Sequence, residues 1–143
     1  MHDAPERRFP IVAVGGVAIT NDSILLIRRG HPPQEGRWSI PGGKVRLGET
    51  LTSALEREFL EETGLVVSCG NLVGIAERMG SDYHFVILDF FVNLTGSLPG
   101  GGRLPQPVAA SDADAAAWVP LAGVAGYDLV DDLLGFLKTH SVL

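Results

Sequence analysis

Residues 50–63 have the most regular helical pattern in the chain. Four apolar residues recur there at spacings of three and four positions: Leu51, Ala54, Leu55 and Phe59. At the start of the segment, Ser53 and Glu56 have the spacing of a capping box, while Thr50 competes as the N-cap. Gly64 provides the left-handed residue that commonly ends a helix. The segment therefore predicts an amphipathic helix with one buried face.

Runs of branched apolar residues on both sides of this helix predict strands. These runs cover residues 9–19, 23–29, 38–40, 65–79, 83–94 and 115–121. The continuous apolar stretch within 83–94 favours an interior strand. A second helix is expected over 128–137, and a loop rich in glycine and proline over 97–107. Two helices among many strands favour an α/β fold, with a mixed sheet covered by helices on both faces.

Short turn and glycine signals divide these strands. Asn21-Asp22 is a turn signal, so the strands at 9–19 and 23–29 are expected to form a hairpin. Gly15 and Gly16 indicate a bulge or a close backbone approach in the first strand. Pro41-Gly42-Gly43 is expected to end the strand at 38–40, and Gly70-Asn71 to interrupt the one at 65–79.

The predicted helix carries three glutamates on one face. Glu58, Glu61 and Glu62 lie at i, i+3 and i+4, an arc of about 100°. Carboxylates this close repel one another and raise one another's pKa values. Two interpretations stay open at this point: a solvated acidic face, or a set of oxygen ligands for a hard divalent cation such as Mg²⁺. Arg57 stands four residues before Glu61 and can hold a carboxylate in orientation.

A longer pattern around this face favours the cation. The segment GKVRLGETLTSALEREFLEETGL resembles the Nudix box of the MutT-like hydrolases, with its fixed residues at Gly43, Glu49, Arg57, Glu58, Glu61, Glu62 and Gly64. Each residue type has an average usage near ~6–7%, so a chance match at a given start is below about 10⁻⁷. Phe59 stands where the family usually has a branched aliphatic residue, which concerns helix packing rather than chemistry.

The resemblance implies a Nudix α/β/α sandwich with a mixed central sheet, in which the box forms a loop–helix–loop. It implies an enzyme that hydrolyses nucleoside diphosphates linked to another group, with Mg²⁺ or Mn²⁺ as cofactor. The implied metal ligands are Gly43 through its carbonyl, Glu58, Glu61, Glu62 and Asp112. The implied catalytic residues are Glu61, Glu58, Arg57 and Asp112, and Glu49 is expected to support the box.

The general base has two candidate places, the box and the loop before the last predicted strand. Asp112 and Asp114 occupy that loop, and Asp112 lies where some relatives place an additional metal-binding carboxylate. The alternative for Asp112 is an ordinary turn residue after Ser111. For substrate binding the sequence suggests Arg29 at the end of a predicted strand, together with Arg37 and Tyr127; Arg78 is a weaker candidate of the same kind.

The box indicates the reaction class but does not determine which group leaves the nucleotide. In layout the chain resembles small ADP-ribose pyrophosphatases and MutT-like members, so the expected substrate is an ADP-ribose-like compound or a nucleoside triphosphate. Relatives that remove oxidised guanine nucleotides recognise the base with an asparagine. In this chain Tyr127 stands at that position, which disfavours an oxidised guanine nucleotide as the substrate. The alternative function is a catalytically weak Nudix domain that binds or senses a nucleotide. An intact box disfavours that alternative.

Composition sets the remaining expectations. With 143 residues, the chain suits a single domain over 1–143, of which residues 1–8 are expected to form a flexible tail. A net charge of -6 disfavours nucleic acid as a partner. One cysteine, Cys69, favours a reducing compartment, and no signal peptide or membrane span is visible, so we expect a cytoplasmic protein. Because dimers are common in the family, the resemblance also suggests a homodimer.

Overall fold

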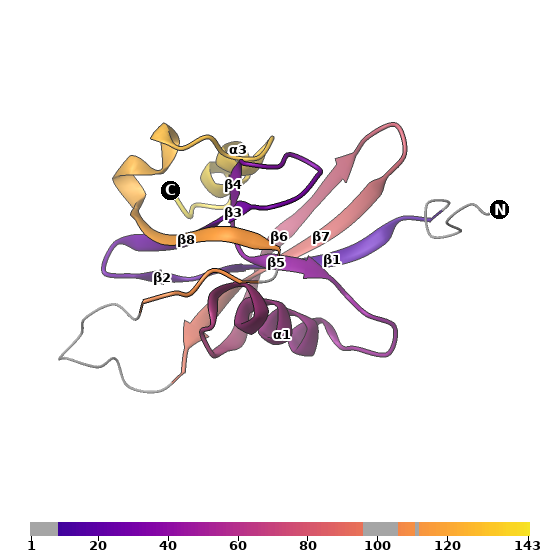
Figure 1. Cartoon of the computed structure of the whole chain (residues 1–143), viewed down its shortest axis with the longest axis horizontal. Helices are drawn as coiled ribbons and strands as arrows, with labels where there is room; N and C mark the ends of the chain where they lie inside the picture. Colours follow the sequence, from indigo (N-terminus) through magenta and orange to yellow (C-terminus); the bar gives the residue numbers. More distant parts are fainter. Residues whose placement is uncertain (1–8, 96–105, 111) are drawn as a thin grey trace.

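The computed structural model describes residues 9–95, 106–110 and 112–143 (Figure 1). Two four-stranded sheets lie between the helix α1 on one side and the helix α3 on the other. This layering confirms the expected α/β sandwich with a mixed sheet. The tail at 1–8 and most of the loop at 97–107 fall outside the described residues. No helix in the described ranges combines the length and the hydropathy that a membrane span requires.

The first sheet is mixed and has the order β5-β1-β7-β6. Its strands are β1 (Ile11–Val17), β5 (Gly42–Lys44), β6 (Val67–Met79) and β7 (His84–Leu94). β1 and β7 run parallel, with Ile11 opposite Phe85, whereas β5 and β6 are antiparallel to their neighbours. β7 is an interior strand, as its apolar sequence predicts. The predicted interruption in β6 is also present, as a register shift between Cys69 and Leu72.

The second sheet is antiparallel and contains β2 (Ile19–Thr20), β3 (Ser23–Arg29), β4 (Trp38–Ser39) and β8 (Ala113–Pro120). The predicted hairpin is only partly right, because β2 alone pairs with β3, while β1 belongs to the first sheet. Asn21 and Asp22 make the turn with φ of 50° and 59°, a conformation that these residues tolerate well. One run of apolar residues therefore supplies a strand to each sheet.

Residues 42–44 differ from the sequence expectation. The strand at Trp38–Ser39 does end before Pro41, but the glycines then form β5 rather than a loop. Gly43 pairs with Val14 of β1, and a Cβ on Gly42 would overlap the Val14 carbonyl oxygen. The glycines thus permit an edge strand that lies unusually close to β1.

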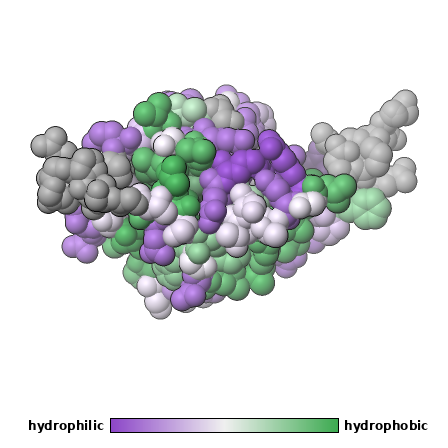
Figure 2. Space-filling view, turned by 90° about the horizontal axis from the view of Figure 1, so that it is seen from below, coloured by the Kyte–Doolittle hydropathy of each residue, from purple (hydrophilic) through white to green (hydrophobic). Residues whose placement is uncertain are grey.

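Helix α1 spans Leu51–Thr63 and covers one face of the first sheet. Thr50 is its N-cap, since the Thr50 hydroxyl accepts a hydrogen bond from the Ser53 N–H at 3.1 Å, and Gly64 ends it with φ of 74°. Phe59 is fully buried, and its ring lies where a Cβ on Gly16 would be. Gly16 therefore makes room for the aromatic ring that replaces the usual aliphatic residue. The α1 side of the surface mixes hydrophilic and apolar patches (Figure 2).

The C-terminal helix is shorter than predicted and starts later. α3 spans Leu133–Thr139, after a 3₁₀ helix, η2, at Leu121–Gly126. Residues 128–130 are not helical, because the Trp38 N–H donates to the Asp128 carbonyl at 2.8 Å and the Val130 N–H donates to the Trp38 carbonyl at 2.9 Å. Leu133 and Leu137 of α3 pack into a core that includes Ile24 of β3.

Candidate active site

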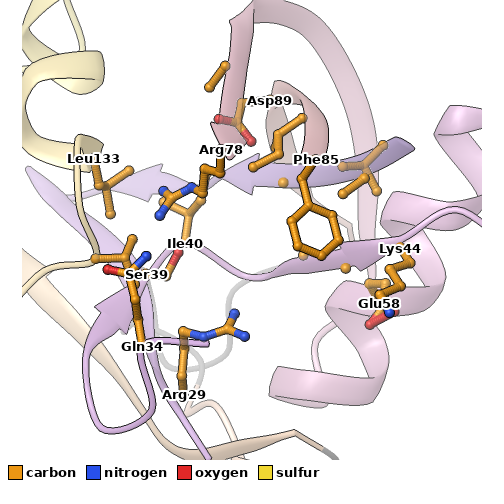
Figure 3. Close-up of a pocket in the computed structure, with 18 of the residues that line it drawn as sticks. Arg29, Gln34, Ser39, Ile40, Lys44, Glu58, Arg78, Phe85, Asp89 and Leu133 are labelled. Atoms are coloured by element: carbon orange, nitrogen blue, oxygen red, sulfur yellow. The ribbon is translucent and has the colours of Figure 1, made fainter. Parts of the chain in front are cut away.

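A cavity of about 520 Å³ lies where the first sheet meets α1, the loop after β3 and the segment leading into α3 (Figure 3). Its lining includes two box glutamates, Glu58 and Glu62, and the backbone of Gly42 and Gly43. Basic side chains also line it: Arg29, Lys44, Arg46, Arg57 and Arg78. The chain as a whole is acidic, but this cavity offers cations beside carboxylates.

Of the three glutamates on the α1 face, Glu62 is buried and Glu58 is partly buried. Glu62 is 5% exposed and accepts a hydrogen bond from the Gly42 N–H at 2.8 Å. Burial raises the pKa of Glu62 to about 8 and also raises the pKa of Glu58, whose side chain is 13% exposed. Burial has a larger effect on these pKa values than repulsion between the carboxylates, which the sequence had indicated as the cause. A solvated acidic face does not describe Glu58 and Glu62.

Arg57 holds the acidic side chains of the box together. Its Nε and Nη2 donate to the two carboxylate oxygens of Glu49 at 2.6 and 2.8 Å. Its Nη1 donates to Glu58 at 3.0 Å and to Glu61 at 3.1 Å. These bonds lower the pKa of Glu49 to about 2 and raise the pKa of Arg57. Because the paired bonds from Arg57 to Glu49 fix the plane of the guanidinium, Arg57 can orient the other two carboxylates.

The donor set suits a hard divalent cation. Glu58, Glu61 and Glu62 offer only oxygen atoms, and the glycine at 43 leaves the Glu58 carboxylate unobstructed, since a Cβ there would overlap it. A cation would also offset the cost of burying Glu62 in the charged form. Among the described residues, no three His, Cys, Asp or Glu side chains lie together as a metal-binding group. The carboxylates of Glu58 and Glu61 instead bind Arg57, and that of Glu62 binds the Gly42 N–H.

Asp112 lies beside this cavity. Residues 108 and 110 run along the end of α1, where the Val108 N–H donates to the Thr63 carbonyl at 2.8 Å. Asp112 then lines the cavity, with its Oδ2 3.2 Å from Nε2 of His31, and its side chain is 61% exposed. Asp114, two residues later, is bound by Arg28 at 2.6 Å and does not line the cavity. The structure thus separates the two loop carboxylates that the sequence left side by side.

The predicted substrate-binding residues fall into two groups. Arg29 lines the cavity, and its burial lowers its pKa although Glu62 and Asp112 act in the opposite direction. Arg37 lies outside the cavity lining, held by Asp131 at 2.7 Å and Asp128 at 3.1 Å. Tyr127 also lies outside it and packs edge-on against Trp38, with ring centroids 5.3 Å apart. The structure therefore brings Arg29 to the cavity but not Arg37 or Tyr127.

Five charged residues of the lining were missed in the sequence: Lys44, Arg46, Glu77, Asp89 and Asp132. Lys44 and Arg46 come from β5 and the turn after it, within the box. Asp89 is the more informative omission, because it is the single charged residue within the run HFVILDFFV. A charged residue inside an interior strand indicates a candidate functional residue, since buried charges need partners.

A comparison with known families decides the assignment. A profile of the NUDIX domain matches residues 10–137. The chain belongs to the NUDIX family. The match covers both sheets, α1 and most of α3, so the fold and the box described above are those of the family.

Named relatives are similar to parts of this NUDIX chain. An ADP-ribose pyrophosphatase of Methanocaldococcus jannaschii is 37% identical over 89 residues, which are 61% of this chain and 53% of the relative. A putative 8-oxo-dGTP diphosphatase 2 of Mycobacterium tuberculosis is 40% identical over 72 residues, 50% of this chain and 49% of the relative. The chain therefore spans about half the length of these curated relatives.

Solved structures show the same fold. The crystal structure of a MutT protein from Methanosarcina mazei superposes with a TM-score of 0.78 at 24% identity, and the match covers 93% of this chain and 94% of the other.

Proposed function

We propose that this NUDIX protein hydrolyses the pyrophosphate bond of a nucleoside diphosphate linked to another group, with Mg²⁺ or Mn²⁺. The observation that carries the proposal is a buried Glu62 and a partly buried Glu58 at a cavity that also holds several cationic side chains. Buried carboxylates beside a basic cavity suit a phosphate ligand together with a divalent cation. A phosphate alone would leave the carboxylates unneutralised, and a cation alone would leave the basic side chains unneutralised.

The cation would be held by Glu58, Glu61, Glu62, the Gly43 carbonyl and Asp112. When bound, it would neutralise charge on the phosphoryl oxygens and lower the pKa of an attacking water. Arg57 orients Glu58 and Glu61 through the bonds described above. Arg29 lies within the cavity and is placed to bind a phosphate by charge.

Asp112 and the box glutamates are the candidates for the general base. Asp112 is exposed and is linked to His31, so it can turn toward a ligand in the cavity without breaking a buried contact. Glu61 is 37% exposed and shares Arg57 with Glu58. Asp112 can accept a proton from a water in the cavity, whereas Glu61 is outside the cavity lining and needs a water at its edge.

For the substrate we propose an ADP-ribose-like compound or a nucleoside triphosphate. The names of the two relatives, an ADP-ribose pyrophosphatase and a putative 8-oxo-dGTP diphosphatase, support these two classes. Tyr127 lies against Trp38 and outside the cavity lining, so it offers no obvious contact to a base there. The cytoplasmic location, the single domain, the homodimer and the absence of nucleic-acid and membrane partners stay predictions.

The test is hydrolysis of a nucleotide panel that includes ADP-ribose and 8-oxo-dGTP, with Mg²⁺, with Mn²⁺ and with EDTA. We expect metal-dependent release of AMP or pyrophosphate, and a loss of about 10²–10⁴ in kcat for Glu58→Gln. Glu56→Gln is the matched control, because Glu56 is on the same helix but outside the cavity lining. Nucleotide binding without turnover would favour the sensing alternative. Full turnover in EDTA would refute the metal mechanism.

A further inference from the structure

A buried carboxylate lies in the wall of the cavity, on a different element from the box glutamates. Asp89 belongs to the interior strand β7 and is 5% exposed. Across the described part of the chain, its Oδ1 is the buried side-chain atom that has no hydrogen-bond partner. Burying a carboxylate without partners destabilises a fold, so this residue needs an explanation other than stability.

Glycines on both neighbouring strands stand opposite Asp89. Gly15 of β1 and Gly74 of β6 are its register partners. A Cβ on Gly15 would overlap Oδ1 of Asp89 and would lie 3.0 Å from the Ile40 side chain. A Cβ on Gly74 would collide with the His140 ring. Gly15 therefore leaves the space that the Asp89 carboxylate occupies at the cavity wall.

Arg78 of β6 faces Asp89 at this end of the cavity (Figure 3). Burial raises the pKa of Asp89 to about 6, and the charge of Arg78 acts in the opposite direction. Burial lowers the pKa of Arg78 itself. Asp89 is therefore mostly ionised at neutral pH, and it is a hydrogen-bond acceptor in the cavity wall.

The other end of the cavity has the charge that suits phosphates. Lys44 lies there, near Glu58, and Arg29 faces the same space. An ionised Asp89 repels phosphate oxygens, so a bound diphosphate belongs beside the cations and the box. The neutral end of the nucleotide is then left for Asp89 and Arg78.

We propose that Asp89, with Arg78 beside it, is a specificity-determining residue that accepts hydrogen bonds from a neutral donor group on the substrate. The inference rests on the proposed function and adds a recognition residue to it. Two parts of a nucleotide carry such donors: the N1–H and 2-amino group of guanine, and the vicinal hydroxyls of a terminal ribose. Either donor pair can bind a carboxylate with both oxygens.

The test is binding measured by calorimetry in a calcium buffer, in which we expect little turnover. GDP is compared with IDP, which lacks the 2-amino group, and ADP-ribose with ADP, which lacks the second ribose. We expect the wild type to prefer one member of one pair, and Asp89→Asn to reduce that preference by about 10- to 100-fold, as for a lost hydrogen bond to a charged group. Asp114→Asn is the control, because Asp114 binds Arg28 outside the cavity.

Each outcome decides the inference. Loss of the GDP preference assigns Asp89 to the base, and loss of the ADP-ribose preference assigns it to the sugar. Unchanged preferences in a folded Asp89→Asn protein, checked by its Tm, overturn the inference and leave the hydrolase proposal standing. An equal loss for all four ligands also overturns it, since that result indicates a structural role. If the wild type binds none of the four, or prefers no member of either pair, the inference fails, and the nucleotide panel alone decides the hydrolase proposal.

Discussion

Replacing Asp89 by Asn should make the protein gain stability relative to the wild type as the pH rises. Burial raises the pKa of Asp89 from its usual 3.8 to about 6 in the folded protein. Between these values the folded state binds more protons than the unfolded state, so the free energy of unfolding decreases as the pH rises through this window. A difference of about 2 pKa units corresponds to about 3 kcal/mol, since one unit is about 1.36 kcal/mol.

The asparagine removes this dependence and keeps the size of the side chain. It adds an amide that itself needs hydrogen bonds, which costs about 1–3 kcal/mol at every pH. The clearest quantity is therefore the change in the mutational effect between two pH values. We expect Asp89→Asn to gain about 2–3 kcal/mol relative to the wild type on going from pH 4 to pH 8.

Urea denaturation of both proteins at pH 4 and pH 8 measures this gain. Glu62, whose pKa is also raised by burial, titrates in both proteins and cancels in the comparison. Arg78 is the cation whose charge acts on Asp89 in the folded protein, and it is present in both. A mutational effect that is the same at pH 4 and pH 8 would refute the argument that the carboxylate is buried without sufficient compensation.

Three further predictions concern activity. Glu62→Gln should lower kcat by about 10²–10⁴ in a steady-state assay with Mg²⁺, because a candidate metal ligand is lost; wild-type kcat would assign Glu62 a structural role. Asp112→Asn should lower kcat by roughly 10²-fold or more, and Asp114→Asn far less, since Asp112 alone of the two lines the cavity; equal effects would contradict this geometry. Arg29→Ala should raise KM by about tenfold through the loss of one phosphate contact, whereas Arg37→Ala should leave KM unchanged; a similar increase in both would show that distance from the cavity does not matter.

The sequence predicts what is encoded locally. The helix over Leu51–Thr63, its stop at Gly64 and the cluster around Glu58 depend on spacings within one segment, and the structure contains all three local features. Pro41-Gly42-Gly43 was expected only to end the strand at 38–40, yet residues 42–44 pair with β1 although glycine disfavours strands. Such pairing involves a distant strand, and no local pattern contains it.

The same limit applies to the cavity. Arg37 and Arg29 look alike in sequence, but acidic residues near position 130 bind the former at the surface. Asp89 reaches the cavity because strands far apart in the chain lie side by side in the sheet. Residue type indicates what a side chain can do, whereas its neighbours decide whether it is free to do it.

The parallel pairing of β1 with β7 also affects the order in which the protein folds. Ile11 of β1 lies opposite Phe85 of β7, so the chain must close a long loop before this part of the sheet exists. Contacts of such long sequence separation slow folding, whereas α1 and the turn at Asn21-Asp22 need only nearby residues. The cavity wall that contains Gly15 and Asp89 therefore forms late, after the local elements. A ligand that contacts this wall should mainly slow unfolding and leave the folding rate almost unchanged.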